Sequence, residues 1–74
     1  MVKVTSMRVE SINGHKRNVV VQLMADTKDE VIVLGNSGAG VEGLTADDTI
    51  VLGSMALCAD GNLGMINSSG QWHW

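Results

Sequence analysis

Only a few side chains in this sequence could take part in nucleophilic or acid–base chemistry. They are the single cysteine, both histidines and three aspartates in the second half: Cys58, His15, His73, Asp47, Asp48 and Asp60. A thiol and an imidazole act together as nucleophile and base when they lie within hydrogen-bonding distance. Cys58 and His73 fall on neighbouring predicted strands, but nothing in the sequence supplies a third, orienting group or an oxyanion hole. We therefore expect Cys58 to be a small buried apolar residue, His73 to be solvated, and the chain to have no catalytic residue.

The three aspartates do not form a metal-binding pattern. Asp47 and Asp48 are adjacent, so on a strand they would point to opposite faces. Asp60 precedes Gly61, and aspartate at such a turn position bonds to the local backbone. The spacing of a calcium-binding EF-hand loop is absent. The sequence predicts no metal site and no cofactor.

A glycine-rich segment divides the chain in the middle. Gly35, Gly38, Gly40 and Gly43 fall within nine residues, 35–43. A phosphate-binding loop would also need a lysine after the glycines and a helix following it, and neither is indicated. We predict a flexible loop over 35–43, the most mobile internal segment of the chain.

Length and charge restrict the function classes further. The 74 residues make one small domain, 45% of them are hydrophobic, and the net charge is −3. We expect no nucleic-acid partner, because phosphate contacts favour basic proteins and the only basic cluster here is His15-Lys16-Arg17. No apolar run approaches the roughly 18–20 residues that cross a bilayer, and the first residues do not resemble a signal peptide. These features predict no membrane association and no secretion.

The first half of the chain is expected to form three strands. Residues 2–12 are rich in β-branched types, and their apolar positions change phase near Thr5-Ser6. This change indicates either a β-bulge or a strand covered on both faces. Asn13-Gly14 predicts a hairpin turn, with a loop longer than two residues, leading into a second strand over 18–25. The apolar run 30–34 predicts a third strand, so that the three form a meander.

The second half is expected to consist of short strands and turns. Residues 45–48 suggest one helical turn capped by Thr45. Turn residues then separate predicted strands over 49–52, 55–59, 62–66 and 71–74. The predicted fold is all-β: one small domain, 1–74, of about six or seven short antiparallel strands, with a meander, C-terminal hairpins and no long helix.

So small a domain needs additional stabilisation. One cysteine excludes an intrachain disulfide, and the only aromatic residues are Trp72 and Trp74. These two rings either close the core of their own chain or anchor a protein interface, and the sequence leaves both interpretations open. We take Trp72, Trp74, Met65 and Ile66 as interface candidates. Unpaired strand edges favour pairing with another chain, so a homo-oligomer is expected.

The C-terminal third resembles a known group of proteins. Gly53-Ser54, an apolar strand, the turn Asp60-Gly61, a return strand and Ser69-Gly70-Gln71-Trp72 are similar to small structural proteins of tailed phages and prophages. The tyrosine or phenylalanine common on the return strand of that group is replaced here by Gly64 and Met65. The resemblance implies a non-enzymatic capsid decoration, head-fibre or tail-associated component, located in the virion or in the host cytoplasm, whose partners are capsid or tail proteins. The alternative is a small β-barrel module that binds nucleic acid or protein.

Overall fold

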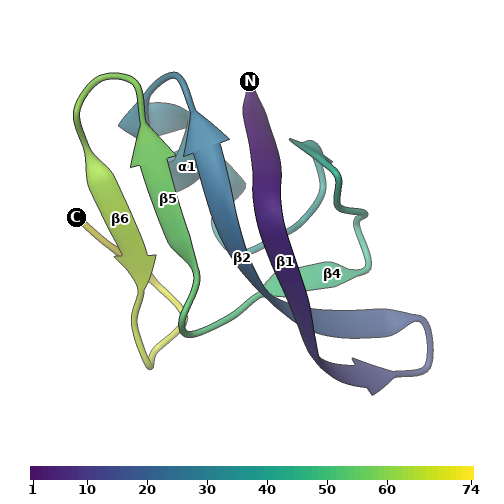
Figure 1. Ribbon diagram of the computed structural model, residues 1–74. Coiled ribbons are helices and arrows are strands. Elements are labelled where there is room, and N and C mark those ends of the chain that lie inside the picture. Colours follow the sequence, from purple (N-terminus) through teal and green to yellow (C-terminus); the bar gives the residue numbers. More distant parts are fainter.

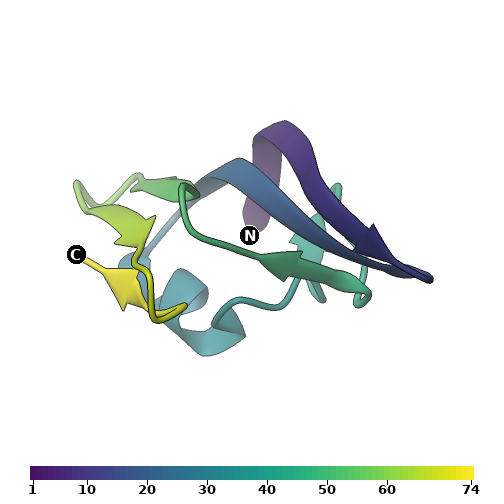
Figure 2. The ribbon, with the colours of Figure 1, turned by 90° about the horizontal axis from the view of Figure 1, so that it is seen from below.

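The computed structural model describes all residues, 1–74, and shows one mixed sheet with a single short helix on one of its faces (Figures 1 and 2). The strand order is β3-β1-β2-β5-β6-β7, and β4 pairs with β2 beside this path. The elements are β1 (Val2–Asn13), β2 (Lys16–Ala25), α1 (Lys28–Leu34), β3 (Val41–Glu42), β4 (Asp48–Ile50), β5 (Met55–Cys58), β6 (Leu63–Ile66) and β7 (Trp72–His73). The all-β class and the absence of a long helix are confirmed.

The β1–β2 hairpin is the longest feature of the sheet and projects beyond the rest of the molecule (Figure 1). Asn13 pairs with Lys16, so the loop has only two residues, and the expectation of a longer loop is wrong. Gly14 has a φ of 67°, a conformation that glycine adopts without strain, which makes the tight turn possible. The pairing register shifts between Val4 and Ser6, which confirms the bulge interpretation of the phase change in β1.

The segment predicted as a third strand, 30–34, is a helix, so the expected meander is wrong. Thr27 begins α1 and its hydroxyl accepts a hydrogen bond from the Glu30 N–H at 3.4 Å. Gly35, with a φ of 63°, ends it. A short apolar run cannot distinguish strand from helix, whereas Thr27, Glu30 and Gly35 are helix start and stop signals that the apolar run obscured.

Three strand pairs are parallel, so the sheet is not the antiparallel arrangement that we expected. β1 pairs with β3, and β2 pairs with both β4 and β5, in the parallel direction. The helix and the segment after it carry the chain across one face of the sheet, and such a crossover allows β4 and β5 to run parallel to β2, the strand that the chain left. β3 runs parallel to β1 and therefore antiparallel to β2. The C-terminal hairpins β5–β6 and β6–β7 are antiparallel, as predicted.

Ser54 lies between the β2–β4 pairing and the β2–β5 pairing. β4 and β5 lie end to end along the same edge of β2, and the chain bends between them at Gly53, whose φ is 100°. The bend leaves the Val21 N–H without a strand partner, and the Ser54 hydroxyl accepts its hydrogen bond at 3.0 Å. Ser54 is fully buried, so this bond keeps a backbone donor satisfied inside the protein.

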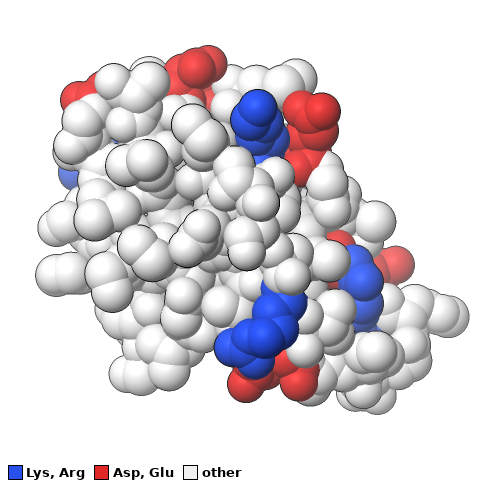
Figure 3. Space-filling view, in the orientation of Figure 1, with Lys and Arg blue, Asp and Glu red and all other residues white.

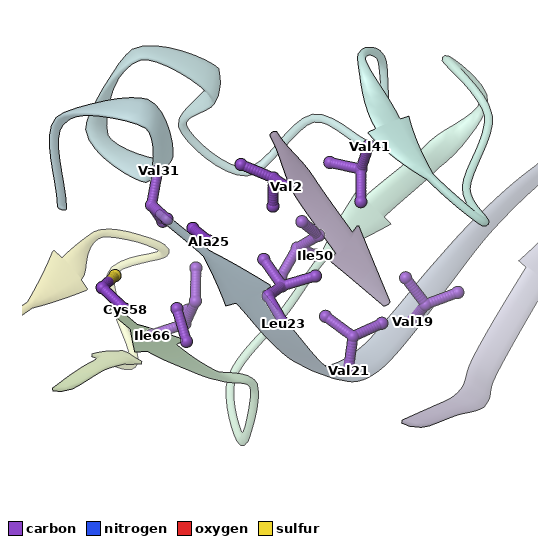
Figure 4. Packing of buried hydrophobic residues seen from close by; sticks show 11 residues of the cluster. Val2, Val19, Val21, Leu23, Ala25, Val31, Val41, Ile50, Cys58 and Ile66 are labelled. Atoms are coloured by element: carbon purple, nitrogen blue, oxygen red, sulfur yellow. The ribbon is translucent and has the colours of Figure 1, made fainter. Parts of the chain in front are cut away.

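The core lies between the sheet and α1 (Figure 4). The residues that alternate along one side of β2 are all buried: Val19, Val21, Leu23 and Ala25. Residues from β1, α1, β3, β4, β5 and β6 complete a cluster of 11: Val2, Val31, Val41, Ile50, Ala56, Cys58 and Ile66 join the four of β2. We call this covered side the inner face of the sheet and the opposite side the outer face.

Candidate functional site: the outer face of the sheet

Cys58 and His73 point to opposite faces of the sheet. Cys58 pairs with Ala25 and is buried with it on the inner face. His73 pairs with Met65 at an exposed position of the outer face. Burial raises the pKa of the Cys58 thiol, which keeps it protonated and unreactive near neutral pH. The two groups therefore do not form a nucleophile–base pair.

Asp48 is buried and binds Arg17. The Arg17 guanidinium donates to both carboxylate oxygens, with Nε–Oδ1 at 2.8 Å and a second bond to Oδ2 at 3.1 Å. The Thr45 N–H also donates to Oδ2, at 2.9 Å. These donors, the Arg17 bond first among them, hold the pKa of Asp48 below its usual value despite burial. The pair fastens the turn before β4 to the start of β2, so its role is structural, and Arg17 is not free for a phosphate.

The segment 45–48 is a single turn, not a helical one. The Asp47 N–H donates to the Thr45 hydroxyl, and the Asp48 N–H donates to the Thr45 carbonyl. The capping residues predicted for a helix are therefore present and make their local bonds, but the chain enters β4 immediately.

Asp60 links a turn to the helix. Its carboxylate accepts from the Lys28 N–H at 2.9 Å and from the Asn62 N–H at 3.1 Å. These backbone bonds, that of Lys28 first, lower the pKa of Asp60. Asp47 is exposed. The structure contains no group of three or more His, Cys, Asp or Glu side chains that could hold a metal ion.

Backbone hydrogen bonds tie parts of the glycine-rich segment 35–43 to neighbouring strands. The Gly38 N–H donates to the Asp48 carbonyl at 2.8 Å, and Val41 is buried in β3 beside Val2. Gly38 has no room for a side chain, because a Cβ atom there would lie 2.5 Å from the Thr45 carbonyl oxygen. Within the segment, the exposed residues are Asn36, Ala39, Gly40, Glu42 and Gly43. Its mobility stays a prediction.

The two tryptophans pack within their own chain. Their ring centroids are 5.9 Å apart, and both rings contact the core. The Trp72 indole N–H donates to the Gly35 carbonyl at 2.6 Å. The Trp74 ring lies on Gly64, where a Cβ atom would come within 2.7 Å of it. The glycine that replaces the usual aromatic residue on the return strand thus makes room for Trp74.

The four interface candidates are divided between the two faces of the sheet. Ile66 is 3% exposed and belongs to the core, where it pairs with Trp72. Both tryptophans are half-buried on this inner side. Met65 is 52% exposed on the outer face. Of the four, Met65 is the one that the structure leaves fully available for contacts.

The outer face carries a continuous apolar surface. Cross-strand partners share a face, and the register aligns Met24 with Leu57 and Leu57 with Leu63. Two residues away along β5 and β6, on the same face, Met55 is opposite Met65. We call these five side chains the outer apolar patch. Met24, Leu57, Leu63 and Met65 are each between 46% and 56% exposed.

Charges lie around the patch and not within it. Figure 3 shows the outer face with a broad uncharged area over β5 and β6 and with charged side chains along its border. At one end of the patch, Met1, Met24 and Leu57 line a shallow hollow of about 470 Å³ together with five other residues, Lys3, Ala25, Asp26, Cys58 and Ala59. No element of the chain covers this face (Figure 2).

Sequence reasoning named Met65 in this patch but missed Met24, Met55, Leu57 and Leu63. A signal for them is present: in 55–58, and at Leu63 and Met65, apolar residues continue where a one-sided strand would alternate with polar ones. Such strands are apolar on both faces. Only the position of α1 decides which face is covered.

Comparison with known proteins finds no matching family model, no similar curated protein and no similar solved structure. No helix of the chain has the length and apolar character that a membrane span requires.

Proposed function

We propose that this protein is a non-enzymatic structural component of a phage or prophage particle, a capsid decoration, head-fibre or tail-associated protein that works by binding copies of itself. The single observation that carries the proposal is the uncovered outer apolar patch. Contiguous apolar surface of this kind marks interaction sites in small proteins.

The balance between buried and exposed apolar residues supports self-association. The core cluster has 11 residues, and 11 large hydrophobic side chains are exposed. Four of the exposed ones belong to the outer apolar patch. Burying them against another copy adds hydrophobic stabilisation that the small core lacks.

A second sheet is the occupant that fits this surface. The patch is formed by neighbouring strands of one sheet, and two sheets pack face to face about 10 Å apart through interdigitating side chains. Leucine and methionine suit such a contact because methionine adapts its shape to the facing surface. The charges at the border remain in solvent when two outer faces meet.

The resemblance of 50–74 to phage and prophage structural proteins supplies the biological setting. The turn and strand residues that carry it form β5, β6 and β7 with the turns between them. Two of these strands bear most of the outer apolar patch, so the segment with the resemblance is also the segment proposed to make contacts.

The test measures molar mass by light scattering over a range of concentrations. Leu57→Thr with Leu63→Thr replaces one cross-strand pair of the patch by residues that keep strand propensity. The matched control is Val33→Thr, which makes the same kind of change at an 86% exposed position on α1. We expect the wild type and the control to exceed the 7.8 kDa of one chain and the double variant to have a lower mass.

A wild type that stays at 7.8 kDa at every concentration contradicts self-association through the patch. The phage assignment has its own measurement, mass spectrometry of particles purified on a density gradient from cells that carry the gene. Absence of the protein from such particles contradicts that assignment, whatever the oligomeric state.

A further inference from the structure

Most of one edge of the sheet has no partner strand. β1 spans 12 residues, and on the side away from β2 it pairs only at Val2 and Lys3, with β3. Beyond Lys3 this edge pairs with no strand of the chain. Backbone N–H and C=O groups along such an edge are free to pair with a strand of another molecule.

The same stretch of β1 also carries exposed apolar side chains. Met7, Val9 and Ile12 lie opposite Val21, Val19 and Arg17, so they are on the inner face. They are 41%, 36% and 67% exposed, because this half of the hairpin projects beyond α1 (Figure 1). A strand added to the edge would lie beside this row.

We propose that two copies of this chain pair through their β1 edges, antiparallel and about a two-fold axis at Val9, to form one continuous sheet. The two-fold axis lies perpendicular to the sheet, so both inner faces stay on the same side. In this register Val9 faces Val9 of the other copy, Met7 faces Ser11 and Ile12 faces Ser6. An interface of this type uses one surface twice, as most dimers of identical chains do.

Charge determines the register. Arg8 and Glu10 form an ion pair of 2.8 Å at the surface of β1, so their side chains lie on one side of the strand. When Val9 faces Val9 across the axis, Arg8 of each copy faces Glu10 of the other. Moving the axis by one residue, to position 8 or position 10, shifts the register by two residues and would instead set Arg8 against Arg8 or Glu10 against Glu10, and like charges directly opposite each other are destabilising.

The bulges in β1 limit the length of the pairing. Register shifts lie between Val4 and Ser6 and between Val9 and Ser11. Bulges are a common protection against uncontrolled edge pairing. In the proposed register Ser6–Val9 of each copy faces Val9–Ile12 of the other, so the bulge between Val4 and Ser6 ends the pairing on both sides and favours a closed pair of chains over an extended array of strands.

This inference rests on the proposed function and specifies a second contact of the same assembly. The outer apolar patch and the β1 edge lie on different parts of the molecule. Each contact alone makes a dimer, and both together make a larger assembly. The two contacts can therefore be removed separately.

The test is charge exchange at Arg8 and Glu10 in the background of Leu57→Thr with Leu63→Thr, so that only the edge contact remains. Arg8→Glu sets like charges against Glu10 of the second copy, and Glu10→Arg does the same against Arg8. We expect each variant alone to have the mass of one chain. An equimolar mixture of the two, and the variant that carries both changes, should have the mass of a dimer by light scattering.

The matched control is Lys28→Glu on α1, away from β1. Ser6→Glu cannot serve as the control because Ser6 also lies on the β1 edge. If Arg8→Glu or Glu10→Arg alone keeps the mass of the background protein, the edge pairing is wrong. It is also wrong if the background protein forms dimers and the mixture of the two variants does not. If the background protein is itself one chain in mass, the edge pairing is wrong. Loss of mass caused by the patch substitutions alone would still support the proposed function.

Discussion

Removing the positive charge of Arg17 is expected to destabilise the fold far more than removing an exposed positive charge. The Asp48 side chain is 0% exposed, and Arg17 supplies two of its hydrogen bonds. Arg17→Met keeps most of the apolar stem and leaves the carboxylate buried without its cation. Breaking a buried pair in this way costs about 3–5 kcal/mol.

The expected loss in this protein is smaller than that range for two reasons. The Arg17 side chain is 33% exposed, so water replaces part of its interaction. The Thr45 N–H continues to bind Asp48. We expect Arg17→Met to lower the free energy of unfolding by about 2–3 kcal/mol at neutral pH. Arg8→Met removes an arginine that is 69% exposed and should change the free energy of unfolding by less than about 0.5 kcal/mol.

The pH dependence gives an independent check. The folded-state pKa of Asp48 is lowered chiefly by Arg17, so the stability it contributes is present above the ordinary aspartate pKa of about 4 and is lost as the pH falls through the folded value. The difference in the free energy of unfolding between wild type and Arg17→Met should therefore have its full size at neutral pH and become smaller in acid. Urea unfolding followed by the fluorescence of Trp72 and Trp74 measures it. An Arg17→Met protein as stable as Arg8→Met, or a difference that is unchanged in acid, would refute the reasoning.

Three further predictions concern buried positions. Ser54→Ala should cost about 1–3 kcal/mol in urea unfolding, because the buried Val21 N–H loses its acceptor; a neutral result would mean that another group accepts this bond. Gly64→Ala should displace the Trp74 ring, since the new Cβ would lie 2.7 Å from it, and should shift the fluorescence maximum as well as reduce stability; an unchanged spectrum would contradict this packing. Cys58 should react with iodoacetamide far more slowly in the folded protein than in urea, because it is buried and its pKa is raised, and equal rates would show that the site is open.

The sequence alone predicted the features that depend on neighbouring residues. The alternation of Val19, Val21, Leu23 and Ala25 places these four residues on one side of β2, because the side-chain direction in a strand alternates residue by residue, and this side is the buried one. The phase change at Thr5-Ser6 indicated the bulge in β1. The turn signals at Gly53, Asp60 and Asn67 separated the C-terminal strands, since turns are specified by their own residues.

The tertiary structure decided the features for which the local sequence was ambiguous. The run 30–34 is apolar enough for a strand or a helix, and packing of Val31 against β2 and its neighbours makes it a helix. Once α1 covers one face, β4 and β5 return in parallel to β2, and the apolar residues of β5 and β6 on the other face are left in solvent. The partners of Arg17, Ser54 and Trp72 lie more than 30 residues away in the chain, so no local pattern could reveal them. The candidate site therefore depends on which face α1 covers, and that follows from long-range packing.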